Sequence, residues 1–568
     1  MWHHPAFRVP IAGHGRPLLD PRRGDNALTW ALDTGILDPA DVSEPTEIPW
    51  SDAALVHDPA YLHSLDDRAT LAHILGTEDN PLIPVAGLVE MWRRASGGVL
   101  AAARWARARD GIGACLMGGF HHAEPDRGGG FCALNDIAIA IARLRADGVR
   151  GHIVVIDLDA HPPDGLAACL AGDPDVDILS LSVASHWTVR PGPHIVDRRV
   201  PAGCTDEPYL REVQRLLAEL HGRPAIAFYL AGTDPLRGDP LGGLSVSEEG
   251  LRRRDRAVLR ALRGVPTVIV PAGGYTDRAW RVLSGTLAEA TGSGATVAPD
   301  YDPLQRRTRY LARRLDVKVL SGEDPDEIGD AELMAELGIA PPPVDRFLGY
   351  YTRHGVEHAL SHYGLLPAVR AMGFDDLQIL TTRQGEQHRL QVSARHGTGR
   401  ADLLDLCLSR RTIAGCRVLF IEWLEMRDPR LTYTAERPEL PGQRGPGLGL
   451  APEVGHLLFA AAQRLSLDGV GLVPAHFHVA WMARHRYTTV DPELRGAFRA
   501  MCEMPLPLSK LSTTLEEGGL PTPEGPVRWE PVPMLCPISE RCHRVVQEGE
   551  DAAEEAYRTM RARLGITT

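Results

Sequence analysis

Three residues in loops that follow apolar runs have the types and spacing of metal ligands. Asp159 and His161 stand two positions apart in IDLDAHPPDG, and Asp234 follows a second apolar run in LAGTDPLRGDP. A D-x-H pair places two ligands on one side of an extended chain, and one more carboxylate leaves a position open for water. A cation held in this way lowers the pKa of its water and polarises a bound carbonyl. The spacing therefore predicts a hydrolytic metal site.

Other residues of these loops could move protons. His121 and His122 are adjacent in GGFHHAEPD, and amide cleavage needs both a base for the water and an acid for the leaving amine. Asp157 and Asp164 could accept hydrogen bonds from the far ring nitrogens, and the Tyr275 hydroxyl in PAGGYTD could donate to an oxyanion. Taken singly, an Asp is more often a helix cap, and a Gly-Gly-Tyr is usually a turn. Their occurrence at successive strand ends favours one catalytic set.

The elements that must position these residues are predicted to be buried parallel strands. From Ile153 onward, short apolar runs alternate with Gly-, Asp- or Pro-rich loops and amphipathic segments. The expected strands are HIVVIDLD, DILSLSV, AIAFYLAG, TVIVPAGG and ACLMGGF (114–120), and residues 135–148 have the period of a helix. Because ligands bind beyond the carboxyl ends of parallel strands, the candidate residues should converge there. Residues 1–300 are thus predicted to form an α/β domain.

Four blocks in this region resemble a known family. GGFHHAEPDRGGGFCALND, VIDLDAHPPDG, AGTDPLRGDPLGGLSVS and PAGGY are similar, in order, to signature blocks of the zinc-dependent histone deacetylase family. The DRGGGFCA and GDPLGGLS variants most resemble its class IV branch, and the match runs from about residue 56 to about residue 290. The resemblance implies the arginase-deacetylase fold and zinc held by Asp159, His161 and Asp234. It also implies the catalytic roles given above for the two histidines, their two Asp partners and the tyrosine.

The resemblance further implies a substrate channel and a second ion. Phe131 would line an acyl tunnel with Gly130 beside it, and the region of Asp157, His161 and Ser182 would hold a structural potassium ion. Class IV members remove long fatty acyl groups as well as acetyl.

The sequence also departs from the family pattern at two places. Pro162 and Pro163 follow the metal histidine, remove two backbone donors and could displace Asp164. Leu241 stands near the place where polyamine-selective relatives have a Glu, which favours a hydrophobic tunnel mouth over an acetylpolyamine substrate.

The composition limits the other classes of function. The 568 residues exceed the size of one usual core, so at least two domains are expected. The net charge of −13, with arginines interleaved among acids, makes nucleic acid a poor partner. No apolar segment is long enough to cross a membrane, and nine scattered cysteines without a CxxC pair suit a reducing cytoplasm.

The second half predicts another α/β module. A linker is expected over 301–344, a second domain over 345–510, and a Pro- and Glu-rich tail with a terminal helix over 511–568. Arg444, Gly447 and Gly449 match R-x-x-G-x-G before a helix, where backbone N–H groups could hold a pyrophosphate. This loop resembles the acyl-CoA loop of GNAT acetyltransferases, and an ordinary turn before a helix is the alternative. Glu422 or Glu425 could serve as base, whereas the helix turn that often carries a Tyr reads Trp481, Met482 and Ala483, with Tyr487 a turn later.

Four functions remain open from the sequence. The leading prediction is a zinc amidohydrolase that removes acetyl or longer acyl groups from acyl-lysine proteins or small acylated amines. The alternatives are a bifunctional deacylase and acyl-CoA-dependent acyltransferase, an acetylpolyamine amidohydrolase, and a non-catalytic acyl-binding scaffold.

Overall fold

The structure is a computed structural model in which the chain divides into two compact units. The first comprises Met1–Arg306 with Ala371–Gly373, and the second comprises Arg307–Arg370 with Phe374–Thr568. The residues that the structure describes are 1–8, 12–13, 16–17, 20–77, 83–184, 188–189, 191–315, 317–322, 346–434 and 438–566. All nine cysteines lie in these ranges and none forms a disulfide.

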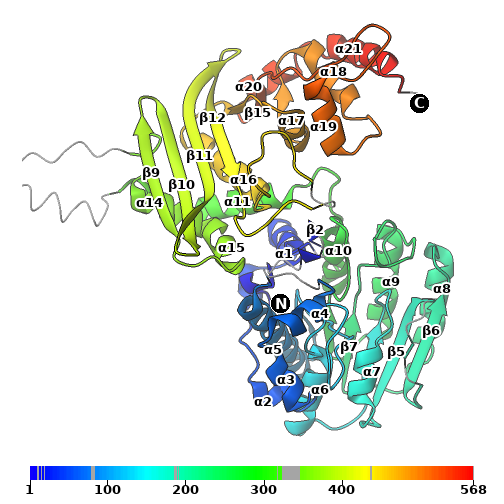
Figure 1. The fold of residues 1–568 in the computed structure, drawn as a ribbon. Helices are drawn as coiled ribbons and strands as arrows, with labels where there is room; N and C mark the ends of the chain where they lie inside the picture. The colour runs from blue at the N-terminus through cyan, green and yellow to red at the C-terminus, as the bar shows by residue number, and fades with distance from the viewer. Residues whose placement is uncertain are drawn as a thin grey trace, which may run out of the picture. The chain divides into compact units, whose positions relative to one another are not determined.

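The first unit is built on a six-stranded sheet in which every neighbouring pair is parallel (Figure 1). The strand order is β3-β8-β7-β4-β5-β6. The strands are β3 (Ile112–Ala114), β4 (Ile153–Asp157), β5 (Val176–Val183), β6 (Ile195–Val200), β7 (Ile226–Leu230) and β8 (Thr267–Val270). This confirms the predicted α/β class for the first half of the chain.

Helices cover both faces of this sheet. On one face Ile153 and Val155 of β4 pack with α3, α4, α5 and α6, and on the other Val154 and Ile156 pack with α1, α8, α9 and α10. Alternate residues of one buried strand thus serve two cores, as a parallel sheet requires. The helices are α1 (Arg23–Asp33), α2 (Trp50–Ala53), α3 (Pro59–Ser64), α4 (Arg68–Leu75), α5 (Val85–Arg109), α6 (Asp136–Ala146), α7 (Asp164–Leu170), α8 (Asp206–Leu217), α9 (Glu248–Ala261) and α10 (Ala279–Thr291). Short elements near the N-terminus are η1 (Pro5–Arg8), β1 (Ala12–Gly13), β2 (Arg16–Pro17) and η2 (Pro39–Asp41).

One predicted strand is displaced. The run 114–120 was expected to be extended throughout, but β3 ends at Ala114. Gly118 and Gly119 have φ angles of +136° and +84°, which are incompatible with a continuing strand. The N–H groups of Gly119 and Phe120 donate instead to the buried Asp136 carboxylate at the start of α6. This turn directs the two following residues toward the carboxyl edge of the sheet.

The second unit contains a mixed seven-stranded sheet of order β14-β15-β13-β12-β11-β10-β9 (Figure 1). Strands β9 to β12 form an antiparallel meander, and α16 connects β12 to the parallel β13. The strands are β9 (Gln378–Gln384), β10 (Gln387–His396), β11 (Gly399–Ile413), β12 (Cys416–Met426), β13 (Gly469–Leu472), β14 (Thr488–Thr489) and β15 (Met534–Pro537). The predicted second domain with a sheet is therefore present.

The remaining helices are α11 (Pro303–Arg314), α12 (Val317–Ser321), α14 (Arg353–His362), α15 (Leu365–Ala371), α16 (Ala451–Arg464), α17 (Phe477–Ala483), α18 (Pro492–Met501), α19 (Leu508–Glu517), α20 (Glu540–Gln547) and α21 (Glu550–Arg563). The expected linker 301–344 includes α11 and α12, and its residues from 323 onward lie outside the described residues. The expected tail contributes β15, which pairs with β13 and β14 inside the sheet. Tail residues 534–537 thus belong to the second unit.

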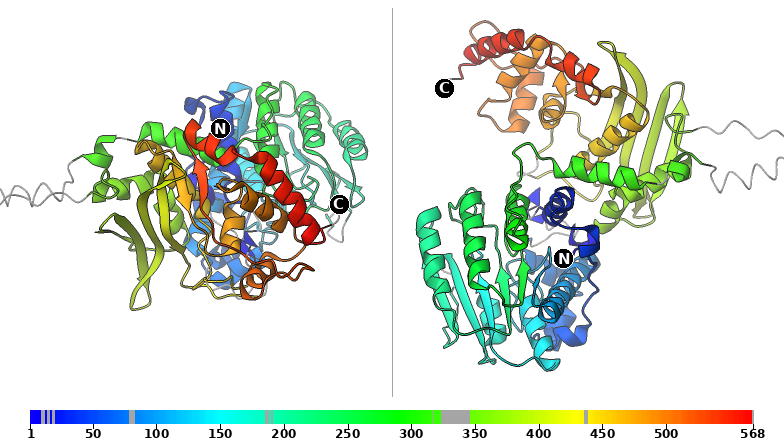
Figure 2. Two further views of the ribbon diagram at one scale, coloured as in Figure 1. Left: turned by 90° about the horizontal axis from the view of Figure 1, so that it is seen from above. Right: turned by 180° about the vertical axis from the view of Figure 1, so that it is seen from behind.

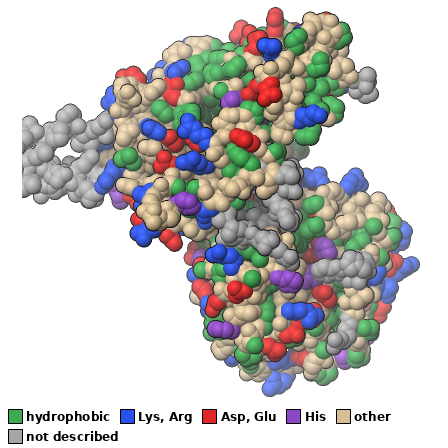
Figure 3. All heavy atoms as spheres, in the orientation of Figure 1, with side chains coloured by type: hydrophobic (Ala, Val, Ile, Leu, Met, Phe, Trp, Pro, Cys, Tyr) green, Lys and Arg blue, Asp and Glu red, His purple; other side chains and the backbone are tan. Residues whose placement is uncertain are grey.

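Two further features concern the helices and the charged side chains of the surface. None of the helices in the described ranges is both long enough and apolar enough to cross a bilayer. Figure 2 shows the same elements from above and from behind, and the long α5 follows one face of the first sheet. On the face drawn in Figure 3, Lys and Arg side chains lie among Asp and Glu on both units.

Candidate active site

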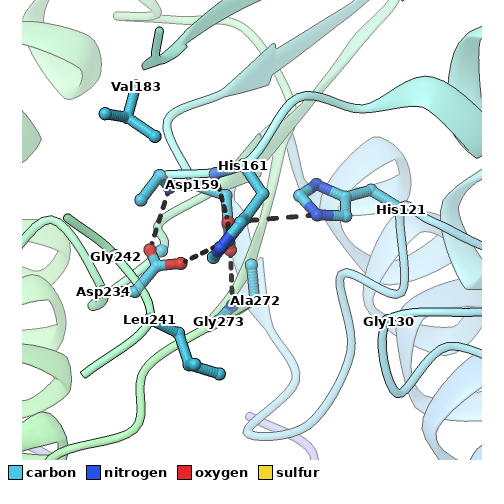
Figure 4. Close-up of polar contacts among 12 residues, drawn as sticks. His121, Gly130, Asp159, His161, Val183, Asp234, Leu241, Gly242, Ala272 and Gly273 are labelled. Atoms are coloured by element: carbon cyan, nitrogen blue, oxygen red, sulfur yellow. Dashed lines mark hydrogen bonds and ion pairs between the residues drawn. The ribbon is translucent and has the colours of Figure 1, made fainter. Parts of the chain in front are cut away.

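Asp159, His161 and Asp234 converge at the carboxyl edge of the first sheet (Figure 4). Asp159 and His161 follow β4, and Asp234 follows β7, the neighbouring strand. The His161 Nδ1 lies 3.0 Å from both Asp159 Oδ1 and Asp234 Oδ2. One ligand atom from each residue lies within 4.8 Å of the others. The structure thus brings together the three residues that the D-x-H spacing indicated.

Backbone groups hold the two carboxylates in place. The Gly273 N–H donates to Asp159 Oδ2 at 2.6 Å, and the Ala160 N–H donates to Asp234 Oδ1 at 3.0 Å. A Cβ at Gly273 would lie 2.6 Å from an oxygen of each carboxylate, so only glycine leaves this space free. Two carboxylate oxygens and one imidazole nitrogen form a donor set that suits Zn²⁺ with an open position.

The two carboxylates of this triad are buried close together. Asp159 and Asp234 are almost fully buried. Burial and the neighbouring Asp159 carboxylate raise the pKa of Asp234. Burial alone would lower the pKa of His161, but hydrogen bonds to the two carboxylates raise it to about 11. The two carboxylates thus favour a positive charge at this position.

The two adjacent histidines lie beside this triad and each has a carboxylate partner. His121 Nδ1 lies 2.8 Å from Asp157 Oδ2, and His122 Nδ1 lies 2.7 Å from Asp164 Oδ1. The two Nε2 atoms face each other at 3.0 Å. His121 Nε2 also lies 3.9 Å from Asp159 Oδ1, which Figure 4 marks with a dashed line.

The environments of these histidines differ in charge. Burial lowers the pKa of His121, but the Asp157 and Asp159 carboxylates outweigh it and raise the value to about 9. Burial, together with the charge of His121, lowers the pKa of His122 to about 4. His121 is therefore the more basic of the two rings and His122 the less basic. A pair of groups with pKa values pushed apart suits acid and base roles.

The two prolines after His161 do not displace Asp164. Asp164 is the first residue of α7, where a missing N–H in the preceding residues removes no helical hydrogen bond. Its own N–H donates to the Pro162 carbonyl at 2.9 Å, and its carboxylate reaches His122. The expected displacement of Asp164 is therefore not observed.

Tyr275 borders the same space from the loop after β8. Its ring centroid lies 5.7 Å from that of Phe131. Its N–H donates to Asp239 Oδ2 at 2.7 Å, while Asp239 Oδ1 accepts from the N–H groups of Leu241 and Gly242. Burial raises the pKa of Tyr275 well above its ordinary value, and the carboxylates Asp159 and Asp234 add to that rise, so its hydroxyl keeps its proton.

Three supporting residues were not predicted from the sequence. Asp239 fixes the Tyr275 loop, and Asp136 holds the turn before the two histidines. Arg23, buried at the start of α1, donates to the Ala272 carbonyl at 2.6 Å and lines the cavity behind Asp159. Asp239 lies in the GDPLGG block and could have been found there, whereas Arg23 is about 250 residues away from the loop that it contacts.

A channel leads from the surface to this site. Gly130, Phe131 and Leu241, the three predicted substrate-binding residues, line it together with His122, His161, Tyr275 and residues 73–76. Gly130 has a φ of +53°, and a Cβ there would lie 2.5 Å from the His122 ring. Leu241 is 38% exposed, at the open end of the channel. The described lining contains no Asp or Glu.

The Gly-rich residues of the second unit lie in the loop between β12 and α16. Arg444 is largely exposed, 3.7 Å from Glu425 and with its guanidinium 5.3 Å from the Trp423 ring centroid. Gly449 has a φ of +76°, and Gly447 lies near the Met426 carbonyl. Glu422 accepts hydrogen bonds from Ser409 and Arg411, so its carboxylate is already engaged.

Comparison with known proteins identifies related sequences for the first unit. A family model described as the histone deacetylase domain matches residues 18–290. Histone deacetylase 2 of Arabidopsis thaliana is 32% identical over 290 residues, which cover 48% of this chain and 74% of the plant protein. An uncharacterised protein of Picosynechococcus is 32% identical over 277 residues, which cover 48% of this chain and 91% of the cyanobacterial protein. A solved structure of an HDAC homolog from Aquifex aeolicus is 21% identical, covers 48% of this chain and 78% of its own, and has a TM-score of 0.41.

Proposed function

The chain belongs to the histone deacetylase family, and on that premise we propose that its first unit is a zinc-dependent amidohydrolase. Its substrates would be acyl-lysine proteins or related small acylated amines, from which it removes acetyl or longer acyl groups. The observation that carries this proposal is the convergence of Asp159, His161 and Asp234 beside the paired His121 and His122. A scaffold that only bound acyl groups would not need this ligand set.

Each residue of the site would have a separate part in amide cleavage. Zn²⁺ held by Asp159, His161 and Asp234 would supply Lewis-acid polarisation of the carbonyl and a more acidic water. Of the two facing histidines, the neutral ring would take the proton of the attacking water and the protonated ring would give one to the departing amine.

Three further residues would orient the histidines or stabilise the developing negative charge. Asp157 and Asp164 orient the two rings through their Nδ1 atoms. The Tyr275 hydroxyl would donate to the oxygen that becomes negative as water adds to the carbonyl.

The channel favours an uncharged acyl chain over a cationic substrate. Phe131 and Leu241 present apolar surface, and the described lining lacks the carboxylate that would attract a polyamine. An acetylpolyamine substrate is therefore the less favoured alternative.

Hydrolysis of a graded substrate series tests this proposal. Zinc-loaded protein should release carboxylate from acetyl-, octanoyl- and dodecanoyl-lysine peptides and should hydrolyse acetylspermidine at least about tenfold more slowly. The channel's apolar lining is the physical reason for this order. Metal-replete protein that cleaves none of these amides would favour the non-catalytic scaffold, and faster turnover of acetylspermidine would favour the polyamine alternative.

Metal binding should release a proton. His161 must be neutral to bind the ion, yet its pKa of about 11 keeps it protonated in the metal-free site at pH 7. The raised pKa means that the proton is held at every pH below about 11, so zinc affinity should rise about tenfold per pH unit between pH 6 and 8. Calorimetric titration in two buffers of different ionisation enthalpy should give about one proton released per Zn²⁺. A binding heat that does not change with the buffer would contradict the assignment of His161.

A structural potassium ion near Asp157, His161 and Ser182 is a further part of the proposal. Ser182 is fully buried, and within the described residues its hydroxyl has no hydrogen-bond partner. A cation beside it would give that oxygen a partner.

The second unit supports a GNAT-like acyl-CoA site as a second candidate. A Gly-rich loop leads to the N-terminus of α16, between the parallel strands β12 and β13, and backbone N–H groups in such a position could bind a pyrophosphate. Arg444, Gly447 and Gly449 would be its contacts. Tyr487 is buried in the core, which raises its pKa and makes it an unsuitable proton donor to a thiolate at the surface. An acyl-CoA-binding or scaffold role is therefore favoured over transferase activity.

A further inference from the structure

An apolar cavity inside the second unit is unrelated to the Gly-rich loop and to the deacylase site. It lies between α14 and α16 on one side and strands β10 and β11 on the other, and it opens to solvent at its mouth. Its lining is formed by leucine, valine, alanine, phenylalanine and tyrosine side chains, with one charged residue, Arg464. An apolar lining with a small number of polar groups is typical of small-molecule sites.

Arg464 occupies an unusual environment at the end of α16. Its Nη1 donates to the Tyr351 hydroxyl at 3.2 Å, and no carboxylate in the described part of the chain forms an ion pair with it. Burial lowers the pKa of Arg464, but the Tyr351 and Tyr363 hydroxyls outweigh it and raise the value. The Tyr363 hydroxyl is itself buried without a hydrogen-bond partner among the described residues. One guanidinium and two hydroxyls therefore meet at the border of an apolar space.

The backbone beside the cavity is held in a strained conformation. Leu348, which lines it, has a φ of +53°, a left-handed value that is costly for a branched side chain. The Phe347 N–H donates to the Tyr351 carbonyl at 2.9 Å, and the Leu348 N–H donates to His388 Nδ1 at 3.1 Å. Strain of this kind persists only where surrounding contacts fix it, and it is concentrated at ligand sites.

Together these features favour one class of ligand. An apolar cavity favours a ligand that makes dispersion contacts along its walls, and the half-buried Arg464, which has a hydroxyl beside it, favours an anionic head group. A carboxylate accepts two N–H bonds from a guanidinium and further bonds from hydroxyls. We propose that this cavity binds a single-chain fatty carboxylate, with the head group at Arg464, Tyr351 and Tyr363 and the alkyl chain among the leucines of β11 and α16.

The proposal does not depend on the deacylase activity of the first unit. The ligand belongs to the chemical class that a long-chain deacylase would release, so the same protein could bind its own product. Because the full-length protein also contains the deacylase channel, variants of the second unit are needed to assign the binding to this cavity.

Direct binding to the full-length protein tests the site with three probes. Dodecanoate has both the tail and the head group, 1-dodecanol has the same tail without the charge, and butyrate has the same head group with almost no tail. Calorimetry should show dodecanoate binding at least about tenfold more tightly than 1-dodecanol, and no binding of butyrate at millimolar concentration. Equal affinity for dodecanoate and 1-dodecanol would refute the role of Arg464.

Variants separate this cavity from the deacylase channel. Arg464→Met should weaken dodecanoate binding about 10- to 100-fold and leave 1-dodecanol unchanged, because it removes charged hydrogen bonds but keeps the apolar stem. Leu406→Trp should fill the cavity and abolish binding of both probes, whereas Leu380→Trp, on an exposed position of β9, should not. The melting temperature and deacylase turnover of each variant verify that the protein is folded. If Arg464→Met, folded by these measures, binds dodecanoate with unchanged affinity, the ligand binds elsewhere and the proposal is wrong.

Discussion

His161→Ala is expected to reduce bound zinc to a small fraction of one equivalent and turnover by more than about a hundredfold. Even the outer partners of metal ligands contribute ten- to hundredfold to affinity or activity, and His161 is the single nitrogen donor among the three converging residues. Its removal also leaves two buried carboxylates, Asp159 and Asp234, without the imidazolium that lies 3.0 Å from each. One of these carboxylates should then bind a proton, which lowers affinity for a cation further.

Metal content after dialysis and turnover of an acyl-lysine peptide are the measurements. His152→Ala is a matched control in the same unit, because His152 also lies 2.8 Å from a carboxylate, that of Asp177. It precedes the amino end of β4, whereas Asp159 and His161 follow the carboxyl end of that strand. The control should retain zinc and activity. A His161→Ala protein that keeps a full equivalent of zinc would show that the ion binds elsewhere.

The positions of the candidate ligands could be predicted because they depend on local features. Each follows a strand whose apolar run is visible in the sequence, and parallel strands bring their carboxyl ends to one edge. Asp159 and His161 need only the alternation of an extended segment to face the same side. For Asp234 the additional requirement is that β7 and β4 are neighbours, and the strand order of the sheet shows that they are.

Residues that act through distant contacts could not be predicted in the same way. Arg23 reaches the loop after β8 from the first helix, and nothing in its local sequence distinguishes it from other arginines. The displaced strand at 114–120 has the same cause, because the N–H groups of Gly119 and Phe120 bond to Asp136, a residue sixteen to seventeen positions away. Apolar composition predicts a strand there, and a side-chain acceptor from another element ends it.

The second unit shows the same limit on a larger scale. β15 comes from a stretch rich in Pro and Glu, and its place between β13 and β14 depends on pairing with segments that are far away in the sequence. β11 carries several charged residues among its apolar ones and was not predicted, yet it forms the longest strand of the sheet. The cavity at Arg464 needs four such elements at once, so no single motif in the sequence indicates it.

Tyr275→Phe is expected to lower the turnover number about 10²- to 10³-fold while zinc content stays at one equivalent. A donor aimed at a developing oxyanion contributes this much, and the substitution removes only that donor. The ring contact with Phe131 at a centroid distance of 5.7 Å and the hydrogen bond from the Tyr275 N–H to Asp239 are both kept by phenylalanine. The Michaelis constant should therefore change much less than the turnover number, because the channel wall is unaltered.

Steady-state kinetics on an acyl-lysine peptide, with zinc measured on the same samples, distinguishes this role from a structural one. Tyr209→Phe is the matched control, because it removes a buried hydroxyl from α8 on the other side of the sheet and should leave turnover unchanged. A Tyr275 that only supported the fold would, on substitution, lower the melting temperature or raise the Michaelis constant. If Tyr275→Phe turns over at the wild-type rate, the oxyanion is stabilised without this hydroxyl, and the proposed mechanism loses its only side-chain donor to that oxygen.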